Sequence, residues 1–147
     1  MIKLFVDTNV ILDTVEPSRI ATSGESTRIM QLVALQDHIR LCISMQSIGD
    51  VAYLGRKRVG KEGIKLIIRE YLNRCKILPM NDMILYEALK LDCPDFEDAL
   101  QIYCADHNCC DYIITNNKKH FSGYTDIPVY TPKEFLKKIT TPSVSCT

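Results

Sequence analysis

The sequence predicts an α/β fold with a mostly parallel central sheet in a single domain. Short, nearly all-apolar runs such as residues 2–6 and 112–114 are followed by polar residues, which is typical of buried parallel strands. These runs alternate along the chain with longer segments whose apolar residues recur at helical spacing. The 147 residues are enough for one hydrophobic core and few for two.

In the first half of the chain, the predicted elements are a strand, a helix, a strand and a helix over residues 2–6, 19–36, 40–43 and 44–57. The first helix is supported by Ile29, Leu32 and Val33, which fall on one helical face. Gly60 and Gly63 then predict a turn.

In the second half, a helix, a strand and two helices are predicted over residues 63–74, 76–79, 82–91 and 95–107. Two strands and a last helix follow over residues 111–115, 127–130 and 131–139. The helix over 63–74 has the clearest amphipathic stripe: Ile64, Ile67, Ile68, Tyr71 and Leu72. Pro128 suits an edge strand, and Pro132 suits the first turn of a helix.

Composition and termini narrow the class of protein. We expect one domain over residues 1–139 and a flexible tail over 140–147. The 18 Lys plus Arg balance the 18 Asp plus Glu, which argues against a protein that coats nucleic acid through bulk positive charge. No apolar run approaches the length of about 20 residues that a membrane helix needs, and Asp7 comes too early for a signal peptide. We therefore expect a cytoplasmic protein with no membrane contact.

Seven cysteines occur without a CxxC pair, so their spacing suits neither a disulfide framework nor a zinc site. Free thiols are the expectation for a reducing compartment.

Polar side chains gather where the predicted elements meet the carboxyl edge of the sheet. Asp7 to Asn9 follow the first strand, and Thr115 to Asn117 follow a later one. Carboxyl ends of parallel strands share one edge, which is where such folds bind ligands. Asp50 and the acids of the predicted helix start complete the group; those acids are Asp95, Glu97 and Asp98.

Carboxylates that share one edge repel one another, and the repulsion raises their pKa values and lowers stability. A divalent cation removes this conflict. Mg²⁺ and Mn²⁺ prefer carboxylate oxygens and retain waters that a phosphate can displace. Phosphodiester hydrolysis with one activated water is the chemistry that fits such a site.

Simpler explanations exist for single residues. Asp95 is a good N-cap, and Glu97 and Asp98 would favour the helix dipole. Asp50 alone is an ordinary surface acid, and Asn9 could cap the next turn. Asp7 is harder to explain, because an acid at the end of a buried strand packs poorly.

Four segments, in this order and spacing, resemble a PIN domain over nearly the whole chain. They are Leu4-Phe-Val-Asp-Thr-Asn-Val-Ile-Leu-Asp13, Asp95-Phe-Glu-Asp-Ala-Leu100, Ile113-Ile-Thr-Asn-Asn-Lys-Lys-His-Phe121 and Val129-Tyr-Thr-Pro-Lys-Glu-Phe135. The resemblance implies a three-layer α/β/α sandwich and a metal-dependent ribonuclease. It also implies a toxin of a type II toxin–antitoxin pair, a small antitoxin partner, and a homodimer formed through N-terminal helices.

By position, the resemblance makes Asp7 and Asp98 metal ligands for Mg²⁺ or Mn²⁺, with a looser match for Asp50 as a third catalytic acid. Family members carry a fourth acid where this chain has Asn117 or His120. An Asn carbonyl can ligate a cation but supplies no charge. We therefore expect Asn117 to complete a catalytic site that binds one metal weakly and has low activity.

RNA contacts are expected from Asn9, Thr115, Lys118 and Lys119, which fall beside this site. For the basic run at 56–58 with Lys61 and Lys65, a solvated helix face is favoured over RNA contact. Tyr53 could stack on RNA bases, but core packing is the default expectation for its side chain.

Two hypotheses follow. The first is a metal-dependent, toxin-like endoribonuclease. The second is a catalytically weakened or inactive module of the same fold that binds RNA or a protein partner.

Overall fold

The computed structural model describes residues 1–15 and 20–140. The strands form one parallel sheet in the order β3-β2-β1-β4-β5. Their bounds are Ile2–Val6 for β1, Ile39–Ser44 for β2, Cys75–Leu78 for β3, Tyr112–Ile114 for β4 and Val129–Tyr130 for β5. The predicted parallel sheet is confirmed, and the last strand lies at an edge as its proline indicated.

The helices are α1 (Thr8–Val15), α2 (Ile20–Ala34), α3 (Met45–Arg74), α4 (Asp82–Lys90), α5 (Phe96–His107), α6 (Lys118–Phe121) and α7 (Pro132–Thr140). Sequence reasoning missed α1 and α6. Helix α1 is rich in β-branched residues, which have low helix propensity. It forms because Val10, Ile11 and Leu12 are buried in the core, so tertiary packing overrides local preference.

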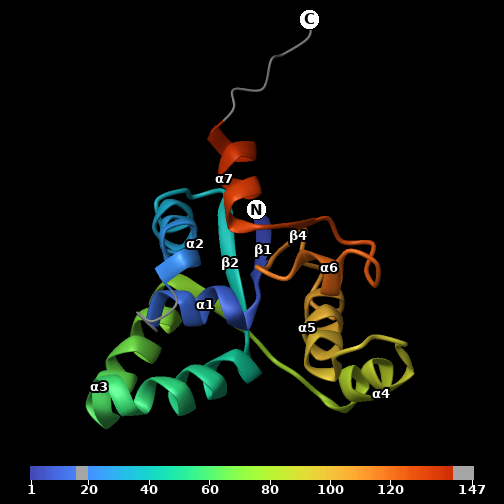
Figure 1. The fold of residues 1–147 in the computed structure, drawn as a ribbon, viewed down its shortest axis with the longest axis horizontal. Helices are drawn as coiled ribbons and strands as arrows, with labels where there is room; N and C mark the ends of the chain where they lie inside the picture. The colour runs from blue at the N-terminus through green and yellow to red at the C-terminus, as the bar shows by residue number, and fades with distance from the viewer. Residues whose placement is uncertain (16–19, 141–147) are drawn as a thin grey trace, which may run out of the picture.

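Helices cover both faces of the sheet (Figure 1). One hydrophobic core joins β1 and β2 to α1, α2, α3 and α7. A second core, on the opposite face, joins the sheet to α4, α5 and α6. The expected three-layer α/β/α sandwich is therefore confirmed.

The central strand β1 serves both cores. Its side chains alternate, so Leu4 and Val6 belong to the first core while Phe5 belongs to the second. All three are fully buried. This explains the continuous apolar run in the sequence, and it fixes Asp7 at the point where β1 leaves the interior.

Helix α3 bends sharply at Gly60, where φ is 69° and ψ is 178°. Only glycine adopts this conformation readily, so the turn predicted between two helices is confirmed as a kink. The two halves fold back closely. A Cβ at Gly55 would lie 2.8 Å from Cδ1 of Ile64, so a larger residue at this position would have to displace the end of that side chain.

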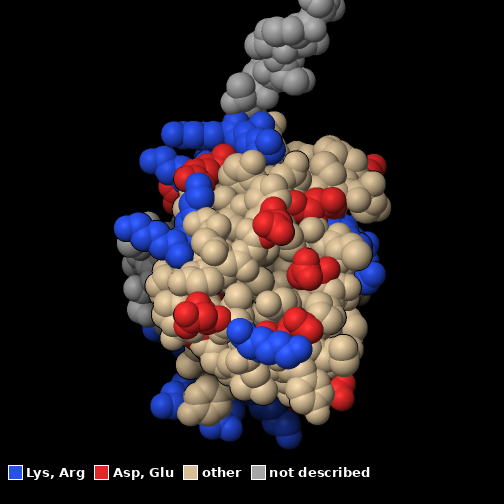
Figure 2. Space-filling model, turned by 90° about the vertical axis from the view of Figure 1, so that its right-hand side faces the viewer, with Lys and Arg blue, Asp and Glu red and all other residues tan. Residues whose placement is uncertain are grey.

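The outer face of α4 exposes large apolar side chains, including Met83, Tyr86 and Leu89. Figure 2 looks onto this side of the molecule, where a few acidic side chains and a basic one beside them interrupt a largely uncharged surface.

The described cysteines are all free thiols, as expected. No helix in the described part of the chain is long and apolar enough to cross a membrane. Residues 141–147 of the predicted tail lie outside the described residues. Thr140, which was assigned to that tail, is the last residue of α7.

Candidate active site at the carboxyl edge of the sheet

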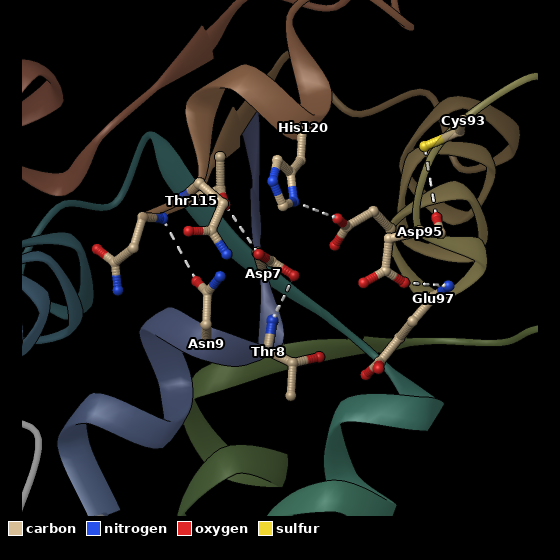
Figure 3. Close-up of polar contacts among 11 residues, drawn as sticks. Asp7, Thr8, Asn9, Cys93, Asp95, Glu97, Thr115 and His120 are labelled. Carbon is tan, nitrogen blue, oxygen red and sulfur yellow. Dashed lines mark hydrogen bonds and ion pairs between the residues drawn. The ribbon is translucent and has the colours of Figure 1, made fainter.

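A cavity of about 440 Å³ opens at the carboxyl edge of the sheet. It brings together the four residues predicted to be catalytic: Asp7, Asp50, Asp98 and Asn117. Asp95, Glu97, Asn9 and His120 also line it. Figure 3 shows Asp7 at the end of β1, facing the first turn of α5. His120 projects toward the same place from α6.

Asp7 lies at the bottom of this cavity and is only 3% exposed. Its Oδ1 accepts a hydrogen bond from the backbone N–H of Thr8, and its Oδ2 accepts one from the Thr115 hydroxyl, both at 2.8 Å. Burial raises the pKa of Asp7 to about 7; the Thr115 bond opposes this rise, and the charge of Asp98 adds to it. The two hydrogen bonds therefore fix the orientation of the carboxyl group, and burial disfavours its charged form.

Asp98 belongs to the first turn of α5 and faces His120 of α6. The ring Nδ1 of His120 lies 2.9 Å from Oδ2 of Asp98. Burial raises the pKa of Asp98, and the hydrogen bond from His120 opposes the rise. Sequence reasoning placed His120 beside the site, at a position where an acid is expected, but did not predict this contact, because nothing local signals a partner 22 positions away.

Asp50 projects from α3 beside Glu97. Burial raises the pKa of both carboxyl groups, and the charge of Asp50 raises that of Glu97 further. Oδ2 of Asp50 is buried without a hydrogen-bond partner in the part of the chain that the structure describes. Asp95 is the N-cap of α5, as the simpler explanation predicted, and its Oδ1 accepts from the Glu97 N–H at 2.9 Å.

A buried polar network supports the elements that carry these acids. The hydroxyl groups of Thr8 and Ser47 share a hydrogen bond of 2.6 Å. Nε2 of Gln101 donates to both, at 2.6 Å to Thr8 and 3.2 Å to Ser47. Thr8 adjoins Asp7 in the chain. Ser47 lies one helical turn before Asp50 on α3, and Gln101 lies one turn after Asp98 on α5. That spacing was available in the sequence, but it was not recognised.

The residues predicted to contact RNA differ in their position relative to the acidic cavity. Asn9 lines the cavity, and its Oδ1 accepts from the Asn116 N–H at 3.3 Å. Thr115 is fully buried behind Asp7, so here it positions that carboxylate. Lys118 pairs with Glu134 at 3.1 Å, and neither Lys118 nor Lys119 lines the cavity.

The donor set fits a hard divalent cation, because it consists of carboxylate and amide oxygens. Four of its carboxyl groups have raised pKa values, and the unpartnered Oδ2 of Asp50 can accept an interaction. Among the described residues, no three His, Cys, Asp or Glu side chains enclose a metal by themselves. A cation here would therefore rely on one or two carboxylates together with water, as Mg²⁺ commonly does.

The family model of the PIN domain matches residues 3–119. The chain belongs to the PIN domain family. Ribonuclease VapC1 of Aquifex aeolicus (strain VF5) is 31% identical over 143 residues, which cover 92% of this chain and 94% of that protein. The resemblance read from the four sequence segments is thus confirmed.

Solved structures share the fold of this PIN domain. DNA-bound VapBC from Salmonella typhimurium gives a TM-score of 0.67 at 16% identity, covering 90% of this chain and 99% of that one. A toxin–antitoxin complex from Klebsiella pneumoniae gives 0.61 at 21% identity, covering 88% and 97%.

Proposed function

We propose that this PIN domain protein is a toxin-like, divalent-metal-dependent endoribonuclease that hydrolyses RNA phosphodiester bonds in the cytoplasm. The observation that carries the proposal is the convergence of four carboxyl groups with raised pKa values on one cavity: those of Asp7, Asp50, Glu97 and Asp98. Similarity to Ribonuclease VapC1 over nearly the whole chain supports RNA as the substrate.

Asp7 and Asp98 would hold Mg²⁺ or Mn²⁺, and Asp50 and Asn117 would complete the catalytic site with their side-chain oxygens. Such a cation would supply charge neutralisation and Lewis-acid activation of water. The chain's own contribution is orientation. Thr8 and Thr115 fix both oxygens of Asp7, and His120 fixes one oxygen of Asp98.

Substrate contacts come from the rim of the cavity. Asn9 lies there, and Lys118 and Lys119 follow directly after Asn117 on α6. Lysine side chains are flexible point charges, so the exposed pair between Lys118 and Glu134 can open at little cost when a phosphate approaches.

The test is cleavage of a mixed single-stranded RNA pool with Mg²⁺ and then Mn²⁺. Wild type is compared with Asp7→Asn, with Asn117→Asp, and with Asp106→Asn as an exposed control at the other end of α5. We expect metal-dependent cutting by wild type and Asp106→Asn, and none by Asp7→Asn. Full activity in folded Asp7→Asn would refute the proposal.

The second candidate is a weakened or inactive PIN domain that binds RNA or a protein partner. It is favoured by Asn117 and by His120, which place an amide and an imidazole on the cavity where family members have an acid. This candidate predicts that Asn117→Asp cuts RNA while wild type only binds it.

We also propose a small antitoxin as a protein partner and a homodimer as the state of the free chain. A toxin–antitoxin complex among the similar structures supports the first. Exposed apolar side chains on α4 support an interface with another protein surface. Light scattering tests the homodimer, which has twice the 16.8 kDa of one chain. Co-purification with a co-expressed antitoxin tests the complex.

A further inference from the structure

A second cavity, of about 530 Å³, lies in the bend of α3. Tyr53 lines both this cavity and the acidic one, so the two cavities adjoin at that residue. Tyr53 is 73% exposed, and the expectation that it packs in the core is therefore wrong. We call this second cavity the α3 groove; besides Tyr53 it is lined by Ala52, Arg56, Lys61, Ile64 and Lys65.

The chain builds the α3 groove through its glycines. The positive φ of Gly60 reverses the direction of α3, so Lys61 and Lys65 come to face Arg56 across the bend. Gly55 on the first half lies close to the side chain of Ile64 on the second, so the two halves pack together there. Ala52 and Ile64 supply an apolar wall, and Tyr53 adds an exposed aromatic ring.

The charges in the α3 groove are all positive, whereas the adjoining cavity is acidic. Arg56 and Lys61 have exposed side chains, and Lys65 forms a solvent-exposed contact of 3.5 Å with Glu62. Such a pair contributes little and opens readily. An aromatic ring beside an apolar wall, with cations at the rim, is the combination that binds a base and its phosphates.

We propose that the α3 groove binds an unpaired nucleotide of the RNA strand whose scissile phosphate lies in the acidic cavity. The base packs on Tyr53, and the flanking phosphates contact Arg56, Lys61 and Lys65. This inference rests on the proposed ribonuclease function and deepens it, because it requires a single-stranded substrate that extends in one direction from the site.

The geometry of α3 supports this path. Asp50, Tyr53 and Arg56 follow one another at intervals of three residues. A helical rise of about 1.5 Å per residue places Arg56 about 9 Å along the axis from Asp50. A strand that leaves the acidic cavity therefore meets Tyr53 first and the cations next. No acid lines the groove among the residues that the structure describes, which favours a polyanion over a protein segment of mixed charge.

The test uses the full chain carrying Asp7→Asn, so that RNA is not cut, and a short fluorescein-labelled single-stranded RNA of mixed sequence as the probe. Affinity is measured by anisotropy over a range of salt concentrations. Tyr53→Ala should weaken binding about 5- to 100-fold with little change in salt dependence, while Tyr53→Phe should bind normally. Arg56→Ala should lower the salt slope by about 0.7.

Lys57→Ala is the matched control, because Lys57 belongs to the same basic run, is exposed, and does not line the groove. The proposal is overturned if Arg56→Ala and Lys57→Ala have equal effects and Tyr53→Ala has none. It is also overturned if the groove variants lose binding of a protein partner but keep RNA affinity.

Cleavage by the same variants with Asp7 intact separates this proposal from the ribonuclease function. Unchanged RNA affinity and cleavage in Tyr53→Ala and Arg56→Ala would refute the α3 groove and leave the nuclease standing. Groove-specific binding by a wild type that cuts no RNA would refute the nuclease and support the groove.

Discussion

The Thr115 hydroxyl donates a hydrogen bond of 2.8 Å to Oδ2 of Asp7 and thereby joins the ends of β4 and β1. The two residues are 108 positions apart in the chain. Burial raises the pKa of Asp7, and this bond is the largest effect opposing the rise. Thr115 therefore both orients the carboxylate and keeps it ionisable near neutral pH.

Removing the Thr115 hydroxyl should move the pH dependence of cleavage. In Thr115→Val the opposing hydrogen bond is lost, so the pKa of Asp7 should rise above about 7 and the rising limb of activity should shift to higher pH. Loss of a buried bond to a charged group should also reduce stability by about 1–3 kcal/mol. A pH–rate profile and urea unfolding measure the two effects. Thr115→Ser keeps the hydroxyl and should resemble wild type; equal profiles for Val and Ser would contradict this role.

Neutralising Asp7 should stabilise the metal-free protein at alkaline pH. Because burial raises its pKa from 3.8 to about 7, the folded chain holds this proton more tightly than the unfolded chain. The resulting contribution of Asp7 to the free energy of unfolding is fully present below pH 3.8. It decreases between pH 3.8 and about 7 and is lost at higher pH, a change of up to about 4 kcal/mol. The stability of Asp7→Asn relative to wild type should therefore increase from pH 4 to pH 8.

Urea unfolding at several pH values with a chelator present measures this trend. Added Mg²⁺ or Mn²⁺ should stabilise wild type and leave Asp7→Asn unaffected. A difference between the two proteins that stays constant with pH would show that Asp7 does not carry the raised pKa.

Gln101 should matter more for catalysis than for stability. Gln101→Leu removes two buried hydrogen bonds that the amide donates. We expect this loss to reduce the free energy of unfolding by about 1 kcal/mol, which is low for the loss of buried hydrogen bonds. The low value is expected because Oε1 of Gln101 has no partner among the described groups, so an unpaired acceptor is removed too. The loss of alignment between α1, α3 and α5 should lower kcat several-fold. Unchanged kcat in a folded Gln101→Leu protein would show that the network is structural only.

Two glycines of α3 should respond to alanine in opposite directions. Gly60 has a positive φ that alanine adopts only with strain, so Gly60→Ala should destabilise the protein by about 1–3 kcal/mol. Gly49 lies in the regular part of the same helix with open space around it, so Gly49→Ala should stabilise it by about 0.5–1 kcal/mol. Thermal unfolding of both variants measures the contrast. Equal shifts would show that the kink is not maintained in solution.

Site residues could be predicted from the sequence where their position depends on the end of a strand or the start of a helix. Asp7 could be placed because a buried strand must end at the carboxyl edge, and Asp98 because a helix start brings its first-turn acids there. Asp50 was grouped with these acids, but its role as a catalytic acid came from the resemblance, since no local pattern distinguishes it from a surface acid. The kink at Gly60 followed from the paired glycines between two helical stripes.

The missed features depend on contacts between distant segments. Gln101 meets Thr8 across 93 positions, and His120 meets Asp98 across 22. Helical and strand periodicities describe which face of an element is buried, but they do not identify the polar partner on another element. Helix α1 was missed for a related reason, because its β-branched residues adopt a helix only when the core packs around them.

The long sequence separation between Asp7 and Thr115 has a consequence for synthesis on the ribosome. The middle strand of the sheet is made first, yet β4, its neighbour on one side, is translated more than a hundred residues later. Until β4 emerges, the carboxylate of Asp7 has no hydroxyl to hold it, and α6 has not brought His120 to Asp98. A nascent chain therefore lacks an ordered acidic centre until translation is nearly complete.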